Sequence, residues 1–174
     1  IIENTNASTA SAVVAFTTTS GGNAATNNRL MNTRVFGSGS LATGVAVNLS
    51  GPAIGSGAGA NGNNNNQVIN NEICRAQVGI FSAGAAAITK SLNNTYNLNE
   101  LDSTGTFGIG RVGIMLLFED APVVNSNRIA NIVNTASTDV MAITLGSNVA
   151  SNTLTTGAET TNATVSNNLI DSIR

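Results

Sequence analysis

A repeating pattern of apolar and polar positions runs through the sequence and centres on asparagine. An apolar residue is followed three positions later by Asn and, two positions after that, by a second apolar residue. The clearest copy surrounds Asn71 and leads into the Gly79-Ile80 step, which is typical of a second short strand. The other copies centre on Asn28, Asn99, Asn127 and Asn168. The five asparagines lie about 28 to 43 residues apart, within the range of solenoid repeats.

A second apolar segment follows the first four of these motifs. Residues 44–47, 79–81 and 113–116 each begin with Gly, and residues 141–145 take the same place with Ala142 instead. Residues 12–16 are placed in the same way before the first motif. Short strands joined by sharp turns predict an all-β fold: a right-handed parallel β-helix, or solenoid, of about four to five coils with loop excursions. Stacked coils would place the asparagines above one another, with their amides joined in a ladder.

The predicted core consists of stacked columns of apolar side chains. Two columns are expected to contain Leu30, Val68, Ile73, Leu101, Val124, Ile129, Val165 and Ile170, and a third Val45, Ile80, Ile114 and Ile143. Residues 48–64 and 147–163 are expected to form loop excursions, because turn-forming and hydroxyl residues dominate them. We expect one domain over residues 1–174, which begins and stops within repeats and is part of a longer chain.

Disorder is the alternative reading of so much Asn, Thr and Gly. Disordered chains, however, lack apolar material to bury, whereas 41% of this chain is hydrophobic. Five motifs in a consistent order with the second strand also favour the folded solenoid.

Composition limits the classes of partner. Charged residues make up 9% of the chain and the net charge is −2, so the sequence has no basic surface for nucleic acid. It has no apolar run long enough to insert into a membrane. Histidine is absent, and the single Cys74 is expected to be a small buried thiol.

The acidic residues give little support for catalysis. Polysaccharide-cleaving enzymes on β-helices need carboxylates that converge on one groove. Glu119 and Asp120 are adjacent, but neighbours in a strand point to opposite faces. A column of charged side chains, worth little in water, is expected on successive coils: Arg29, Glu72, Glu100 and Arg128. We therefore expect no catalytic residues, no metal site and no cofactor, and a protein that is not an enzyme.

Several segments resemble the β-helical repeat region of giant surface proteins of Bacteroidetes-type bacteria, which the type IX system exports. The resemblance rests on residues 70–85, 97–105, 111–120, 127–132 and 162–170. It implies an extracellular, cell-surface location and an adhesive or filamentous role. It also makes Asp102-Ser103-Thr104 and Asp171-Ser172-Ile173 similar to O-glycosylation signals of these bacteria, with Ser103 and Ser172 as the acceptors.

The sequence as a whole predicts a structural segment of an extracellular adhesin or filament protein that attaches to cells or surfaces. The expected partners are further copies of itself in a homo-oligomeric fibre, and cell-surface glycans or prey or host cells. The alternative is a carbohydrate-active β-helix enzyme or a sugar-binding module whose site lies outside this segment.

Overall fold

The fold is all-β with parallel sheets, as seen in a computed structural model that describes residues 1–17, 24–51, 62–86, 88–134, 140–146 and 158–174. The only helical turn among these residues is a short 3-10 turn, η1 (Gly105–Phe107). The all-β class expected from the sequence is therefore confirmed for the described residues. The centres of both predicted loop excursions, at 52–61 and 147–157, lie outside them.

The strands of the described residues form three larger sheets and one two-stranded pair. Sheet I consists of β3 (Arg29–Met31), β6 (Gln67–Ile69), β10 (Thr95–Asn97), β14 (Val123–Asn125) and β17 (Thr164–Ser166). Sheet II consists of β1 (Ile2–Glu3), β4 (Arg34–Phe36), β7 (Glu72–Cys74), β11 (Glu100–Asp102), β15 (Arg128–Ala130) and β18 (Leu169–Asp171). Sheet III consists of β2 (Ala12–Ala15), β5 (Val45–Leu49), β8 (Ala76–Ala83), β12 (Ile109–Leu117) and β16 (Met141–Leu145). A separate pair is formed by β9 (Ser91–Leu92) and β13 (Glu119–Asp120).

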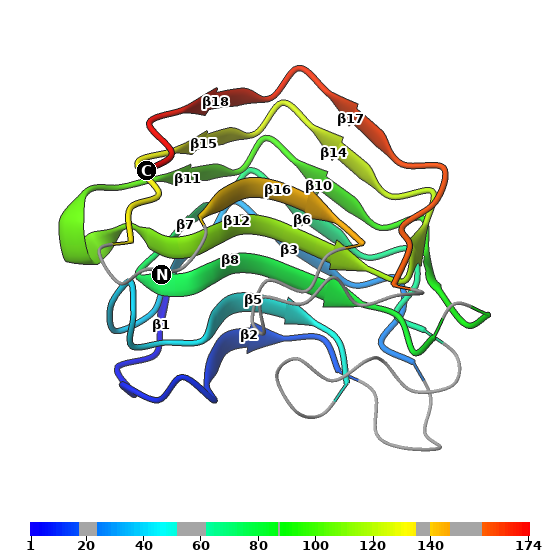
Figure 1. The fold of residues 1–174 in the computed structure, drawn as a ribbon. Coiled ribbons are helices and arrows are strands. Elements are labelled where there is room, and N and C mark those ends of the chain that lie inside the picture. Colours follow the sequence, from blue (N-terminus) through cyan, green and yellow to red (C-terminus); the bar gives the residue numbers. More distant parts are fainter. Residues whose placement is uncertain (18–23, 52–61, 87, 135–139, 147–157) are drawn as a thin grey trace.

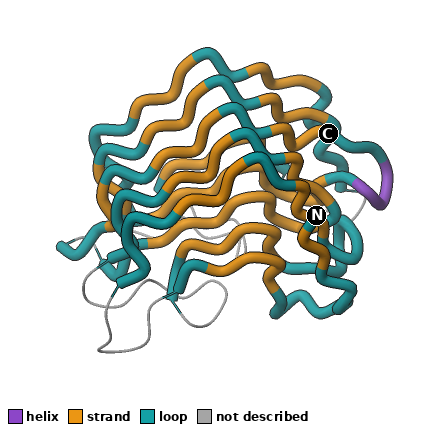
Figure 2. Tube along the Cα trace, turned by 180° about the vertical axis from the view of Figure 1, so that it is seen from behind, coloured by secondary structure: helices purple, strands orange, loops and turns teal. Residues whose placement is uncertain are grey.

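The chain visits the sheets in the same order on every pass. The strands β3, β4 and β5 lie in sheets I, II and III, and the same order holds for β6 to β8, for β10 to β12 and for β14 to β16. We call each such pass a repeat unit. Equivalent strands of successive units pair in parallel, so each sheet grows by one strand per unit (Figure 1). The strands of sheets I and II are stacked in the same way when the molecule is seen from behind (Figure 2).

The core lies between the sheets and is built from columns of aligned side chains. In sheet I the register aligns Leu30, Val68, Tyr96 and Val124, and none of these is more than 8% exposed. In sheet II it aligns Val35 with Ile73, and Leu101 with Ile129, all fully buried. Each middle residue of a three-residue strand thus points inward, as strand alternation requires.

The core prediction is wrong for two residues at one end of the stack. Val165 and Ile170 continue the columns in register but are 46% and 48% exposed. They lie in β17 and β18, which are edge strands of their sheets among the described residues. No described strand covers their outer side, so their inward direction does not bury them.

The register of sheet III also corrects the prediction. Ile80, Ile114 and Ile143 do align, but their counterpart in β5 is Val47. Val45 pairs instead with Val78 and belongs to a second apolar cluster, together with Phe81 and Met115. Sheet III is therefore apolar on both faces, a property typical of buried parallel strands.

Glycine in β8 and β12 is required by the close approach of neighbouring strands. A Cβ at Gly79 would lie 2.4 Å from a methyl of Leu101 and 2.7 Å from the carbonyl oxygen of Gly113. A Cβ at Gly113 would lie 2.6 Å from the carbonyl oxygen of Ala142 and 2.8 Å from a methyl of Ile129. The Gly-Ile step thus marks the place where sheet III contacts the sheet II column.

Sharp corners separate sheets I and II, and one residue with a left-handed backbone makes each turn. Asn32, Asn70, Leu98, Ser126 and Asn167 hold left-handed φ values between 54° and 56°. Asparagine adopts this conformation more readily than most residues, which accounts for three of the five. A predicted asparagine follows one position later at four of these corners, and Thr33 follows Asn32 at the fifth.

Candidate functional site

The most regular polar feature is a row of side-chain amides inside the corner between sheets I and II. Asn99 Nδ2 donates to Asn127 Oδ1 at 3.0 Å and to the Val68 carbonyl at 2.8 Å. Asn71 donates to Asn99 Oδ1 in the same way at 3.0 Å, and Asn127 to Asn168 Oδ1 at 2.9 Å. Each acceptor oxygen also receives the backbone N–H of the asparagine before it. The structure therefore brings four of the five predicted asparagines together.

The fifth predicted asparagine, Asn28, belongs to a different row. Its Nδ2 donates to Asn66 Oδ1 at 3.1 Å, and Asn66 N–H donates to Asn94 Oδ1 at 2.9 Å. This second row lies before sheet I, whereas the place next to Asn71 is taken by Thr33, whose N–H donates to Asn71 Oδ1. The assignment of Asn28 to the ladder is therefore wrong. The reason is that an Asn two positions before an inward residue occurs twice in a repeat unit.

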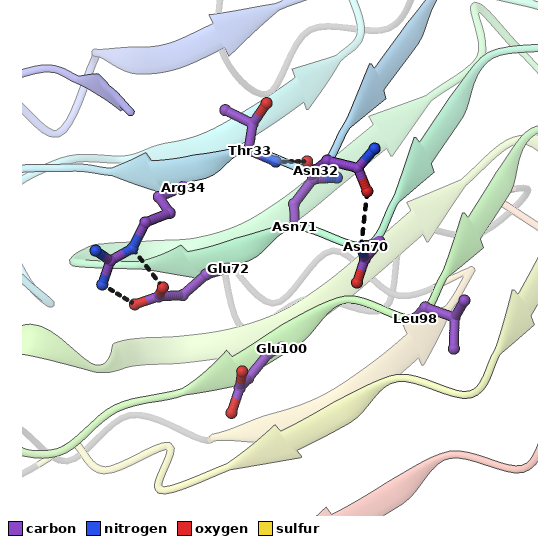
Figure 3. A pocket seen from close by; sticks show the side chains of 8 residues that line it. All are labelled: Asn32, Thr33, Arg34, Asn70, Asn71, Glu72, Leu98 and Glu100. Carbon is purple, nitrogen blue, oxygen red and sulfur yellow. Dashed lines mark hydrogen bonds and ion pairs between the residues drawn. The ribbon is translucent and has the colours of Figure 1, made fainter.

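Beside the amide row lies a shallow surface groove of about 310 Å³ (Figure 3). It crosses three successive repeat units at the same corner. The lining side chains are Asn32, Thr33, Arg34, Asn70, Asn71, Glu72, Leu98 and Glu100.

The charges in this groove differ from the predicted column. Glu72, Glu100 and Arg128 do stack in register, but Arg34 occupies the place that was expected for Arg29. Arg29 pairs with Gln67 in sheet I. The prediction matched the motif around Asn28 to the corner between sheets I and II, whereas that motif lies before sheet I. The prediction for Arg29 is therefore wrong.

The ion pairs leave one carboxylate of the groove alone. Arg34 binds both oxygens of Glu72, at 2.6 and 3.1 Å. Arg128 turns away from its neighbour Glu100 and binds Asp102 at 2.6 Å. Within the described part of the chain, the Glu100 carboxylate has no hydrogen-bond or ion-pair partner. It is exposed and lies directly beside Glu72 in the sheet.

A second acidic group, Glu119, is fully buried next to the core. Its Oε1 accepts hydrogen bonds from Asn94 Nδ2 at 2.9 Å, from Tyr96 Oη at 2.7 Å and from the Ser82 hydroxyl. Its Oε2 is buried and has no partner in the structure. Burial raises the pKa of the Glu119 carboxyl, against the three hydrogen bonds that lower it. The adjacent Asp120 points outward, as predicted, and binds Thr161 at 2.7 Å.

This buried cluster was not found from the sequence. Its members come from β8, β10, β13 and the turn before β10, and only the stacking of repeat units brings them together. The only signal in the sequence was an acidic residue, Glu119, that directly follows a long apolar run.

Arg75 forms a separate surface cluster at the corner between sheets II and III. Its guanidinium lies 5.0 Å from the ring centre of Phe36 and 4.9 Å from that of Phe107. It also pairs with Glu3 at 3.0 Å. The preceding residue, Cys74, is buried as predicted, and burial raises the pKa of its thiol to about 11.

The remaining predicted positions are placed as follows. Ser103 and Ser172 are half-buried and directly follow the last residues of β11 and β18 at the same corner. No group of three or more His, Cys, Asp or Glu side chains in the described ranges is arranged to hold a metal ion. Those ranges also contain no helix with the length and apolar character to cross a bilayer.

Comparison of the chain with protein-family models, with curated proteins and with solved structures gives no match.

Proposed function

We propose that the repeat units wind as a right-handed parallel β-helix of about four to five coils. The uniform order of the three sheets in each unit supports this proposal, as does the parallel pairing of equivalent strands. Right-handed winding follows from the strong preference of parallel crossover connections.

We further propose that the chain is a structural, non-enzymatic segment of a giant surface adhesin or filament protein, located outside a bacterial cell and exported by a type IX system. The observation that carries this proposal is the continuous amide row. Asn71, Asn99, Asn127 and Asn168 cross-link neighbouring units through buried hydrogen bonds in addition to the strand pairing. A row of this kind resists lateral slippage of one unit over the next, as a filament under tension requires. The resemblance of residues 64–174 to surface-protein repeats supports the same role and the surface location.

In this proposal the partners are other copies of the protein in a fibre, together with glycans or cells to which the fibre attaches. A test is immunogold electron microscopy of intact cells of the source bacterium, with antibodies raised against residues 1–174. We expect linear label on the outer surface, and label that is lost in a mutant lacking a working type IX exporter. Label confined to the cytoplasm would contradict the proposal.

The second candidate is a sugar-binding module or a carbohydrate-active β-helix enzyme. It is favoured by the groove, in which a free carboxylate lies beside a carboxylate–guanidinium pair (Figure 3). Release of reducing sugar from plant or bacterial polysaccharides by the purified chain would support the enzyme, and saturable binding without release would support the module.

A further inference from the structure

Three local features of the groove are unfavourable for folding, and they occur within three residues of one another. The first is Leu98, which holds a left-handed φ of 56°. A side chain with a Cβ is disfavoured there, and Asn holds the equivalent place in the two preceding units, at Asn70 and Asn32. The second is that Leu98 exposes 52% of its surface to solvent.

The third feature is the placement of Glu100. Its Cα partner in β7 is Glu72, so two carboxylates lie side by side on one sheet face, an arrangement that destabilises a sheet. The guanidinium on its other side, Arg128, is engaged with Asp102. Local choices that oppose folding are expected at functional sites, where binding and not stability selects the residue.

We propose that this groove binds a neutral, hydroxyl-rich carbohydrate, with Glu100 as the main hydrogen-bond acceptor and Leu98 as an apolar surface for a sugar ring. The unused polar atoms decide the class of ligand. Glu100 offers both carboxylate oxygens, and Asn70 has its Oδ1 free because only its Nδ2 is engaged, with Asn32. A ligand must therefore donate hydrogen bonds, and a pair of neighbouring hydroxyls matches a carboxylate well.

The groove offers a hydrogen-bond donor as well as acceptors, which favours a hydroxyl-rich ligand over a cation. Arg34 carries a positive charge into the same groove and neutralises Glu72, at 2.6 Å. One net negative charge is left, on Glu100. Sugar hydroxyls can donate to this carboxylate and also accept from the Arg34 guanidinium, whereas an ammonium group has no acceptor to offer it. The groove follows the corner across three units, so the ligand is expected to be a linear oligosaccharide running across the strands. This inference rests on the adhesive role proposed above and adds the class of ligand, a neutral oligosaccharide, that the groove would bind.

The test is an NMR titration of the 174-residue chain with neutral oligosaccharides of the cello, manno, xylo and laminari series. We expect saturable shifts of the Leu98, Glu100 and Asn70 amides with at least one series. Glu100→Ala and Leu98→Asn should each weaken this binding by more than about tenfold, since each removes a main contact. Leu98→Asn keeps a residue that adopts the corner conformation, so it stays folded and separates binding from stability.

Matched controls use the same chemistry elsewhere. Ser126→Asn changes the equivalent corner of the next unit, and Asp171→Ala removes an exposed carboxylate in β18, so both should bind like the unmodified chain. Spermidine serves as the cationic probe. Shifts at Glu100 with spermidine but with none of the oligosaccharides would overturn the proposal in favour of a cation site. The absence of saturable binding, or equal binding by the groove variants, would also overturn it. Surface label in the immunogold experiment combined with no sugar binding would refute this site alone and leave the filament proposal standing.

Discussion

The buried amide row makes a sharp prediction for the change Asn99→Asp. The substitution keeps the shape of the side chain and removes only its two N–H donors. Asn99 is 1% exposed, and its Nδ2 bonds the Val68 carbonyl at 2.8 Å and Asn127 Oδ1 at 3.0 Å. After substitution a carboxylate oxygen faces these two acceptors. Asn127 Oδ1 keeps the backbone N–H of Asn99, so the two lost hydrogen bonds, of about 0.5–1.5 kcal/mol each, should lower the free energy of unfolding by about 1–3 kcal/mol.

The effect of Asn99→Asp should also depend on pH. Repulsion from the two acceptors favours the protonated form of the new carboxyl, so its pKa in the folded state lies above the unfolded value of about 3.9. The folded state then binds more protons, and the loss of stability grows as the pH rises above that value and shrinks as the pH falls. The assay is urea unfolding followed by circular dichroism, at about pH 4 and about pH 7.

The matched control is Asn70→Asp, one position before the ladder residue Asn71. Asn70 is exposed, holds the left-handed corner and makes one side-chain bond, to Asn32 at 2.7 Å. Because Asp also tolerates this conformation, we expect a loss below about 1 kcal/mol. Equal small losses for Asn99→Asp and Asn70→Asp would refute the role of the buried row.

Three further changes test the packing. Ile129→Ala should cost about 2–5 kcal/mol in thermal or urea unfolding, and clearly more than Ile170→Ala, because Ile129 is fully buried and Ile170 is 48% exposed. Gly113→Ala should cost about 1–3 kcal/mol, since the new Cβ would overlap neighbouring atoms. At Gly39 the nearest atom to a new Cβ is 3.7 Å away, so Gly39→Ala should be tolerated. Equal melting temperatures for the two variants would contradict this. The pKa of Glu119 is raised in the folded state, so the unmodified chain should lose stability as the pH rises from about 4.3 through that value, and Glu119→Gln should lack this part of the pH dependence in urea titrations.

The all-β class and the later repeats could be read from the sequence because their spacing is constant. Asn71, Asn99 and Asn127 are each separated by 28 residues, and their strands pair in the expected register. The alternation of inward and outward residues then assigns the core without further information. This is why Ile73, Leu101 and Ile129 were correctly predicted.

The first repeat was misread because its spacing differs. Asn28 and its counterpart in the next unit, Asn66, are 38 positions apart. The 28-residue spacing of the later units therefore does not locate the equivalent residues of the first unit. The same error moved the charge column from Arg34 to Arg29, and a two-residue shift in β5 exchanged Val47 for Val45. Hydrophobicity alone could not correct the shift, because both valines are buried, in two different apolar clusters.

A local pattern also cannot show which residues meet across units. Asn63 falls within the expected loop excursion, yet it is fully buried, with Nδ2 bonded to the carbonyls of Phe16 and Ser50. The groove is likewise formed by residues of three units that only stacking brings together. Leu98 stands out as a candidate binding residue only once its left-handed backbone conformation is known.

The most direct test of the central proposal is cryo-electron microscopy of the native protein purified from the surface of the source cells. A structural β-helix predicts elongated particles whose strands lie across the long axis. The strands should repeat along that axis at the spacing of paired strands, about 4.7–4.9 Å. Density for the side chains of Asn71, Asn99 and Asn127 should form one continuous row beneath a corner of the particle. Particles without this axial repeat, or with the three asparagines apart from one another, would contradict the proposal.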